Sequence, residues 1–337
     1  MRKILLLILM ACLGLSCTRP MIAAFGSNSE IVIITSPRCR DQAETLKSVL
    51  EREILTVQYE KAYEVRVVST AEFKGDRNRK NIVLMDYFRP EGDPSLTRTI
   101  LGLAGRDKEA FAEGRLNLKA IHDRWAKGQV LILIAAPGQP ELDDLLAGQA
   151  DSVFDFVAKE VQTRLNRAIF HAGEQEGASA RLAETYGWSL RLPTGYDIDE
   201  TYASQRAIKI LKDKPARMIT VYWEGGEWPD AASTCLDRKK MLAWEFWDQD
   251  EVVEDGLKVD MGSFLGHEST VLSGTWENKK YTIGGIFATY CFTCDQCGRN
   301  YVIDASTFAP GLEKLPLMRE LQAILVTFTC QHPTRKQ

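Results

Sequence analysis

The sequence predicts an α+β fold made of two mixed α/β lobes, the second of them richer in antiparallel strand. Residues 29–172 alternate short apolar runs of strand length with segments of helical periodicity, whereas residues 180–330 consist mainly of strand-like segments. A polar stretch at 171–179, which contains Gly173 and Gly177, separates the two patterns and is typical of a domain boundary. With 337 residues, of which 45% are hydrophobic, the chain has enough apolar material for about two domains.

The N-terminal lobe opens on a strand followed by a helix. Residues 31–34 (IVII) have the length and composition of a buried strand, and Pro37 separates them from a helix whose apolar residues share one face. Asp151 and Ser152 cap a later helix that carries apolar residues at spacings of three and four. Between these two helices we expect strands at 65–68, 82–85 and 130–136, and a helix around 96–103.

The C-terminal lobe is distinguished by its tryptophans and its strands. Six of the 7 tryptophans lie beyond residue 179. Residues 235–247 are expected to be helical, and a second helix follows Pro316, with Leu321, Ile324 and Leu325 on one face. Strand-like segments occur at 189–192, 207–211, 218–223, 270–276, 281–292 and 301–304.

The first residues of the chain predict export. Arg2 and Lys3 precede an apolar run at 4–15 that ends on Ser16 and Cys17. The run is shorter than the roughly 20 apolar residues that a membrane span needs. This pattern is typical of a secretory signal peptide, which is removed from the mature protein.

The end of this signal resembles that of a bacterial lipoprotein, in which cleavage occurs just before a cysteine that is then acylated. We therefore expect a signal peptide at 1–16, lipidation of Cys17 and a tether at 17–28, followed by lobes at 29–172 and 180–330. Cys12 is the alternative lipidated residue, although it leaves only residues 4–11 as the apolar core. A lipoprotein retained in the inner membrane often has aspartate directly after the lipidated cysteine. This chain has Thr18 there, which favours the outer membrane by resemblance to known sorting rules.

The charge of the chain argues against nucleic acid as a partner. The sequence has 42 basic and 46 acidic residues, and loss of Arg2 and Lys3 with the signal makes the mature chain more negative. Such a chain has no basic field to neutralise phosphates, and its one dense basic run, at 74–80, is expected to be a solvated hairpin loop. The expected membrane contact is the N-terminal lipid.

Cys291, Cys294 and Cys297 form the cluster of residues that is most able to bind a metal or form disulfides. Two thiolates two residues apart on a tight turn can bind one zinc ion, with Cys235 or Cys330 as a further ligand. However, six cysteines remain after Cys17, an even number, and an exported protein meets a disulfide-forming compartment. We therefore expect disulfides at this cluster, with a metal loop as the alternative, and we assign no resident metal or cofactor.

Trp223, Glu224, Glu227 and Trp228 are the candidate ligand-binding residues. Two acids bracketed by tryptophans are compatible with a glycosidase in which paired carboxylates act on a sugar stacked on an indole. A tryptophan-rich surface that binds a glycan or a peptide is favoured over the enzyme, and acidic residues in a glycine turn usually face water.

Standard hydrolase signatures are missing from the sequence, so no catalytic residue is assigned. Residues 262–266 have serine beside the first glycine and therefore do not form a nucleophile elbow, and His267 lacks the second histidine of a metalloprotease helix. Convergence of Glu224, Glu227, Asp248 or His267 into one cavity would favour an enzyme. Their dispersal would favour a binding protein.

Several short pieces, taken together in their order and spacing, resemble a family of Gram-negative cell-envelope lipoproteins known as a domain of unknown function. The resemblance spans roughly residues 25–330. It implies an envelope location and no assigned reaction, ligand or catalytic residue. The matching pieces are 29–30, 79–83, 125–129, 192–196, 274–277, 284–287, 309–310 and 319–325.

These observations predict a lipid-anchored periplasmic protein, at the outer membrane, with a non-catalytic binding or scaffolding role in the cell envelope. Its expected partners are the membrane, through the lipid, and an envelope protein or glycan. The alternative is a hydrolase that acts on envelope glycan. Neither cysteine pairing nor oligomeric state follows from the sequence.

Overall fold

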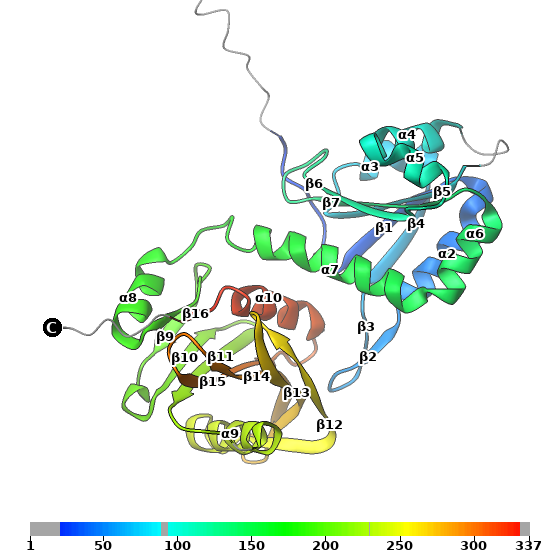
Figure 1. The fold of residues 1–337 in the computed structure, drawn as a ribbon. Helices are drawn as coiled ribbons and strands as arrows, with labels where there is room; N and C mark the ends of the chain where they lie inside the picture. Colours follow the sequence, from blue (N-terminus) through cyan, green and yellow to red (C-terminus); the bar gives the residue numbers. More distant parts are fainter. Residues whose placement is uncertain (1–20, 89–93, 229, 331–337) are drawn as a thin grey trace, which may run out of the picture.

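A computed structural model describes residues 21–88, 94–228 and 230–330, and these residues form the predicted α+β fold (Figure 1). The expected signal peptide, Cys12, Cys17 and the start of the tether lie outside the described residues. Within the described ranges, no helix combines the length and the apolarity that crossing a membrane requires.

The first sheet has the strand order β4-β1-β5-β7-β6. Four of these strands run parallel, and β6 is antiparallel to β7. Every residue of β5 and β7 is buried, which explains why their sequences are largely continuous apolar runs. The strands are β1 (Glu30–Thr35), β4 (Glu64–Ser69), β5 (Asn81–Tyr87), β6 (Leu118–His122) and β7 (Val130–Ala136).

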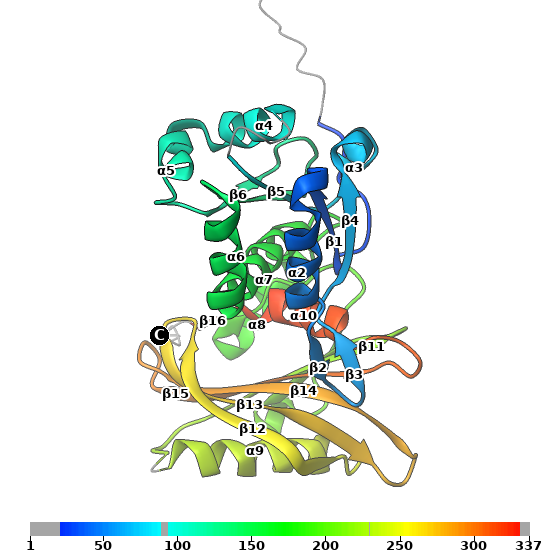
Figure 2. The same ribbon diagram turned by 90° about the vertical axis from the view of Figure 1, so that its right-hand side faces the viewer.

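Helices cover both faces of the first sheet (Figures 1 and 2). Because side chains alternate along a strand, Ile31 and Ile33 pack with α2, α6 and α7, whereas Val32 and Ile34 pack with α4 and α5 on the opposite face. The helices are α2 (Arg40–Leu50), α4 (Pro94–Ala104), α5 (Lys108–Ala112), α6 (Gln139–Gly148) and α7 (Ala150–Ala168). Short connecting turns are η1 (Pro37–Cys39), η2 (Thr70–Glu72), α3 (Phe73–Asp76) and η3 (Gly105–Asp107).

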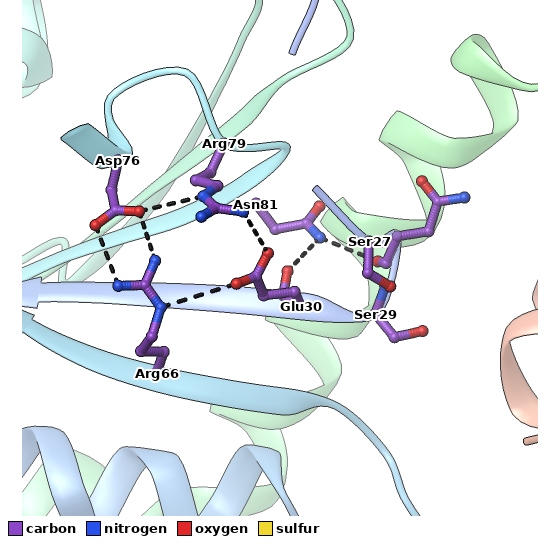
Figure 3. A network of polar contacts seen from close by, with 8 residues as sticks. Ser27, Ser29, Glu30, Arg66, Asp76, Arg79 and Asn81 are labelled. Atoms are coloured by element: carbon purple, nitrogen blue, oxygen red, sulfur yellow. Dashed lines mark hydrogen bonds and ion pairs between the residues drawn. The ribbon is translucent and has the colours of Figure 1, made fainter. Parts of the chain in front are cut away.

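The basic run at 74–80 is not a hairpin loop. The strands on either side of it, β4 and β5, both pair in parallel with β1 instead of with each other, so the run belongs to a crossover connection. Asp76 within the run accepts hydrogen bonds from Arg66 (3.2 and 2.5 Å) and from Nε of Arg79 (3.2 Å), as Figure 3 shows. Arg79 also pairs with Glu30 at 3.2 Å, which closes a ring of two arginines and two acids at the start of β1.

The second sheet is antiparallel throughout, with the order β12-β13-β14-β15-β11-β10-β9. Its strands are β9 (Asp197–Asp199), β10 (Ala207–Lys212), β11 (Ala216–Glu224), β12 (Glu251–Phe264), β13 (His267–Asn278), β14 (Ile283–Cys294) and β15 (Arg299–Phe308). Sequence reasoning missed β12, whose residues are mostly exposed and therefore lack an apolar pattern.

Helices pack on both faces of the second sheet. On one face, α9 (Ala231–Phe246) buries Leu242 and Phe246 against β13 to β15; on the other, α10 (Leu315–Leu325) buries Leu321 and Ile324. Asp230 caps α9 by accepting hydrogen bonds from the amides of Ala232 and Ser233. The remaining elements are α8 (Glu176–Tyr186), η4 (Ala203–Gln205) and the pair formed by β8 (Trp188–Ser189) and β16 (Thr329–Cys330).

A hairpin of the first lobe, β2 (Glu53–Leu55) and β3 (Tyr59–Lys61), reaches the second lobe beside α10 (Figure 2). The buried carboxylate of Glu60 accepts hydrogen bonds from the backbone amides of Lys314 (2.9 and 2.8 Å) and Leu315 (2.9 Å). These amides are at the start of α10 and have no partner within the helix. Glu60 therefore caps a helix of the other lobe.

Candidate functional site: an aromatic cavity

A cavity of about 640 Å³ lies at the C-terminal end of α9, where it meets one end of the second sheet. We call it the aromatic cavity. Its volume is within the range of small-molecule sites. It is lined by Tyr202, Lys209, Ala216, Met218, Trp244, Glu245, Phe246, Trp247, Asp248, Gln249, Asp250, Trp276, Asn278, Tyr281, Ile283 and Phe308.

The aromatic wall comes from the last turn of α9 and the loop that follows it. Trp244 and Trp247 lie three residues apart, so both reach the cavity from the same end of the helix. Trp247 is fixed by its indole Nε1, which donates to Oγ1 of Thr220 at 2.9 Å. The ring of Phe246 packs against that of Tyr202, with centroids 4.6 Å apart. The wall is thus held in place by the sheet.

Three residues around the cavity have left-handed backbone conformations without being glycine. The φ angles are 53° for Asp248, 68° for Gln249 and 56° for Thr282, which is next to Tyr281 and Ile283. Such conformations cost on the order of 1 kcal/mol or more each, and they persist where surrounding contacts hold them. Asn278 supplies such contacts.

Asn278 is 2% exposed and joins the two sides of the cavity. Its Nδ2 donates to the backbone oxygen of Asp248 (2.9 Å) and to Oδ1 of Asp250 (2.8 Å), and its Oδ1 accepts from the amide of Tyr281 (3.1 Å). The loop after α9 and the turn between β13 and β14 are therefore fixed to each other by one side chain.

The charged groups of the cavity are mainly acidic. Hydrogen bonds from Tyr281 and Lys280 lower the pKa of Asp248, whereas burial raises the pKa of Asp250. The lining cation, Lys209, forms an ion pair with Asp199 at 3.0 Å. Its ammonium group also lies 4.8 Å from the ring centroids of both Tyr202 and Trp247, so its charge is already engaged.

Two rings of the cavity are half exposed, and Lys280 lies 4.6 Å from the ring centroid of one of them, Tyr281. Trp244 and Tyr281 are each 51% exposed although both line the cavity. Trp276, by contrast, is 5% exposed, and its Nε1 has no hydrogen-bond partner within the described part of the chain. The cavity therefore combines exposed aromatic faces with carboxylates and a buried donor.

Gly284 and Gly285 are needed for close backbone approach next to this cavity. A Cβ atom on Gly285 would lie 1.8 Å from the backbone oxygen of Thr307, and one on Gly284 would lie 2.6 Å from that of Trp276. Both distances are far below van der Waals contact. The glycine pair thus allows β14 to fit between its neighbours at the point where Ile283 enters the cavity wall.

The candidate residues around Glu224 lie elsewhere. Trp223 is 8% exposed and packs in the core with Tyr186 and Trp188, so it presents no free ring. Glu224 accepts hydrogen bonds from Tyr222, from Nε1 of Trp228 and from Nε of Arg238, each at 2.8 Å.

The two acids of this segment differ in their surroundings. Glu227 is exposed, and Glu224 is engaged by its three donors. His267 stacks on Phe292, with ring centroids 5.2 Å apart. Of Glu224, Glu227, Asp248 and His267, only Asp248 lines the aromatic cavity, which is the dispersal that favours a binding protein.

The cysteines form two disulfides, Cys235–Cys291 and Cys294–Cys330. Cys297 is a free thiol, so the expectation that all three clustered cysteines are disulfide-bonded is wrong for Cys297. The even number of cysteines was not a guide to pairing, because one of them, Cys39, is buried in the core of the first lobe away from every other cysteine of the described residues. The second lobe is left with an odd number of cysteines.

Sequence reasoning missed the aromatic cavity. The feature of the sequence that could have indicated it is residues 244–248 (WEFWD). There, two tryptophans three residues apart lie at the end of a helix, and an aspartate follows. The cavity also needs Trp276 and Tyr281 from a distant hairpin, and no periodicity in the sequence indicates that these residues meet the end of α9.

Residues 248–327 match the model of a family described as a domain of unknown function (DUF4837). The match begins at a residue of the cavity wall and includes Asp250, Trp276, Asn278 and Tyr281. No curated protein matches the chain.

Three solved structures are similar to parts of the chain. A Bacteroides thetaiotaomicron protein has 9% identity and a TM-score of 0.29, with 45% of this chain and 47% of that one covered, so this chain spans about half its length. The Ran-binding protein Mog1p of Saccharomyces cerevisiae has 12% identity and a TM-score of 0.31 (44% and 94% covered). LpqN of Mycobacterium tuberculosis, involved in cell envelope biogenesis, has 14% identity and a TM-score of 0.28 (43% and 83% covered). At these TM-scores the similarities carry no functional argument.

Proposed function

We propose that this protein is a lipid-anchored protein of the bacterial envelope that binds a glycan in the aromatic cavity without changing it. The observation that carries the proposal is the pair of half-exposed rings, Trp244 and Tyr281, next to the carboxylate of Asp248 in a cavity of about 640 Å³.

A sugar fits this combination of groups. Its C–H face packs on an aromatic ring, and its hydroxyls donate to carboxylates or pair with amides. The backbone around the cavity is held by Asn278, so little ordering would oppose binding. Glu245, Asp248 and Asp250 repel anions, and Lys209 is engaged by Asp199. The expected ligand is therefore a neutral glycan or an amino sugar.

The test is a titration with soluble neutral oligosaccharides, followed by tryptophan fluorescence. Wild-type protein should respond saturably, and Trp244→Ala and Tyr281→Ala should each weaken binding at least about tenfold, because loss of a central aromatic contact costs about 1.4 kcal/mol or more. Met261→Ala is the matched control, since Met261 is 69% exposed on β12 and outside the cavity. Equal binding by all variants would contradict the proposal.

The lipid anchor is tested separately, because Cys17 lies outside the described residues. Cys17→Ser should move the protein from the membrane fraction to the soluble fraction, since several acyl chains at about 0.8 kcal/mol per buried methylene are lost with it. Cys12→Ser should leave the protein membrane-bound. The opposite pattern would assign lipidation to Cys12.

Hydrolysis of the bound glycan is the second candidate function. It is favoured by two carboxylates in one cavity, Asp248 and Asp250, whose pKa values are shifted in opposite directions, as an acid and base pair requires. New reducing ends would then appear when wild-type protein is incubated with the oligosaccharide, and Asp248→Asn and Asp250→Asn would abolish them. Binding without new reducing ends would exclude hydrolysis of that oligosaccharide and support binding without catalysis.

A further inference from the structure

Three sulfur atoms meet at the opposite end of β14 from the aromatic cavity. The Sγ atoms of Cys294, Cys297 and Cys330 all lie within 4.8 Å of one another. We call this set the three-sulfur cluster. We propose that it is a site of thiol–disulfide exchange, in which Cys297 displaces Cys330 from its disulfide with Cys294.

The turn between β14 and β15 holds the free thiol beside the disulfide. Cys294 ends β14, and its backbone oxygen accepts from the amide of Gly298 at 2.9 Å. Gly298 has φ of 65°, a left-handed conformation that glycine adopts without penalty. The turn thus brings Cys297 back toward Cys294, and the hydroxyl of Tyr301 lies 3.7 Å from the Cys297 sulfur.

The exchange is balanced without an external oxidant or reductant. Cys297 loses its proton to solvent and attacks Sγ of Cys294; the Cys294–Cys297 bond forms, the Cys294–Cys330 bond breaks, and the Cys330 thiolate takes up a proton. The products contain one disulfide and one thiol, as the reactants do.

Burial decides which sulfur leaves. Cys294 is fully buried, whereas Cys330 is only partly buried. A thiolate is stabilised by water and destabilised by apolar burial, so Cys330 is the better leaving group. Cys297 is also only partly buried, so it is accessible to solvent. Exchange therefore runs between Cys294–Cys330 and Cys294–Cys297.

The second disulfide provides an internal control on the same strand. Cys291 lies three residues before Cys294, and its partner is Cys235; these residues are 2% and 0% exposed. No third sulfur of the described residues joins them in a cluster. The other free thiol, Cys39, lies in the core of the first lobe, where burial raises its pKa to about 12. Exchange should thus be confined to the three-sulfur cluster.

The consequence of exchange is release of the last strand. Cys330 belongs to β16, which pairs with only two residues of β8. When the disulfide moves to Cys294–Cys297, this short pairing loses its covalent tie to the sheet. The position of the disulfide within the cluster thereby determines whether β16 is covalently attached to the sheet.

The test uses the mature protein, unreduced, incubated at pH 8, quenched in acid, alkylated under denaturing conditions and mapped by peptide mass spectrometry. Cys39 is free and should be alkylated in every sample, and alkylation should also be found at Cys330 as well as at Cys297, with Cys235 and Cys291 unmodified. The rate at which alkylated Cys330 accumulates should fall as the pH of the incubation is lowered, because only the thiolate attacks.

Two variants sharpen the result. Cys330→Ser should contain a Cys294–Cys297 disulfide and no free thiol in the cluster, and Cys297→Ser should contain only Cys294–Cys330. Alkylation of Cys39 and Cys297 without Cys330 at pH 8 in the unmutated protein would overturn the proposal, as would scrambling that includes Cys235 and Cys291. One zinc ion per chain, with Cys294, Cys297 and Cys330 all reduced, would replace exchange by metal binding.

Discussion

The two sheets of this protein differ in how completely they are covered. All residues of β5 and β7 in the first sheet are buried, and helices cover both of its faces. In the second sheet, β12 is mostly exposed, with Met261 at 69% and Val259 at 48%. The covered sheet acts as a scaffold, whereas the partly open one carries both the aromatic cavity and the three-sulfur cluster.

The two lobes also differ in how exposed the side chains of their ion pairs are. In the first lobe, Arg66 and Asp76 belong to the ring at the start of β1, where Arg66 is 42% exposed. In the second lobe, Lys239 of α9 and Asp304 of β15 form an ion pair at 2.8 Å with side chains only 4% and 2% exposed. Asp304 also accepts from the hydroxyl of Thr289 at 2.6 Å. The open sheet thus depends on a buried pair that fixes α9 to it.

The largest expected effect comes from breaking that buried pair. Lys239→Met leaves the carboxylate of Asp304 buried and without its cation, which should lower the free energy of unfolding by about 3 to 5 kcal/mol. Arg66→Met should cost about 1 kcal/mol or less, because Arg66 is 42% exposed and Asp76 keeps its hydrogen bond from Arg79. Urea denaturation of both variants measures the contrast, and equal losses would show that the lobes do not differ in this way.

A smaller loss of stability is expected at α10, a helix of the second lobe that also contacts the first lobe. Leu321 is fully buried, so Leu321→Ala should lower the free energy of unfolding by about 2 to 5 kcal/mol through lost contacts and a cavity. Leu312, which is 52% exposed just before the helix, is the matched position, and Leu312→Ala should change stability little. A loss below about 1 kcal/mol for Leu321→Ala would mean that this face of α10 is not sealed.

The smallest expected effect is on the pH dependence of stability, and it arises from a buried acid in the first sheet. Asp86, at the end of β5, is fully buried, and burial raises its pKa although Ser36 and Arg38 contact it. The folded state therefore binds this proton more tightly than the unfolded state. Stability should fall as pH rises from the unfolded value of about 3.9 through the raised folded value.

The measurement is the free energy of unfolding of Asp86→Asn against pH. The variant should lack the decline just described, and its curve should be flatter than that of the wild type above about pH 4. Asp76 gives the opposite sign: burial acts to raise its pKa, but Arg66 and Arg79 outweigh burial and lower it, so its contribution is lost as pH falls. An unchanged slope in Asp86→Asn would contradict the burial argument.

The first lobe was largely predictable because its strands are buried on both faces. The predicted segments at 31–34, 65–68, 82–85 and 130–136 lie within β1, β4, β5 and β7. The sequence did not indicate which strands pair with each other, because the parallel pairing of β4 and β5 with β1 depends on contacts between segments that are distant in the sequence. The short edge strand β6, whose residues are all half-buried, also went unpredicted.

The second lobe was predictable only where its strands are covered. Segments in β10, β11, β13, β14 and β15 were found, whereas β12 carries charges on an exposed edge and escaped detection. The sequence did not indicate the aromatic cavity for a related reason. Trp223 and Trp228 are close in sequence, but the cavity is built by Trp244 and Tyr281, which meet only through the fold.

The cap that Glu60 places on α10 bears on where the protein can be divided. The segment that matches the family model, 248–327, contains α10 but excludes Glu60. It also excludes Lys239, Cys235 and β11, which pairs with β15 along its whole length. Expressed alone, the segment would expose an open strand edge and an uncapped helix start, so the unit that folds is larger than the unit that sequence similarity defines.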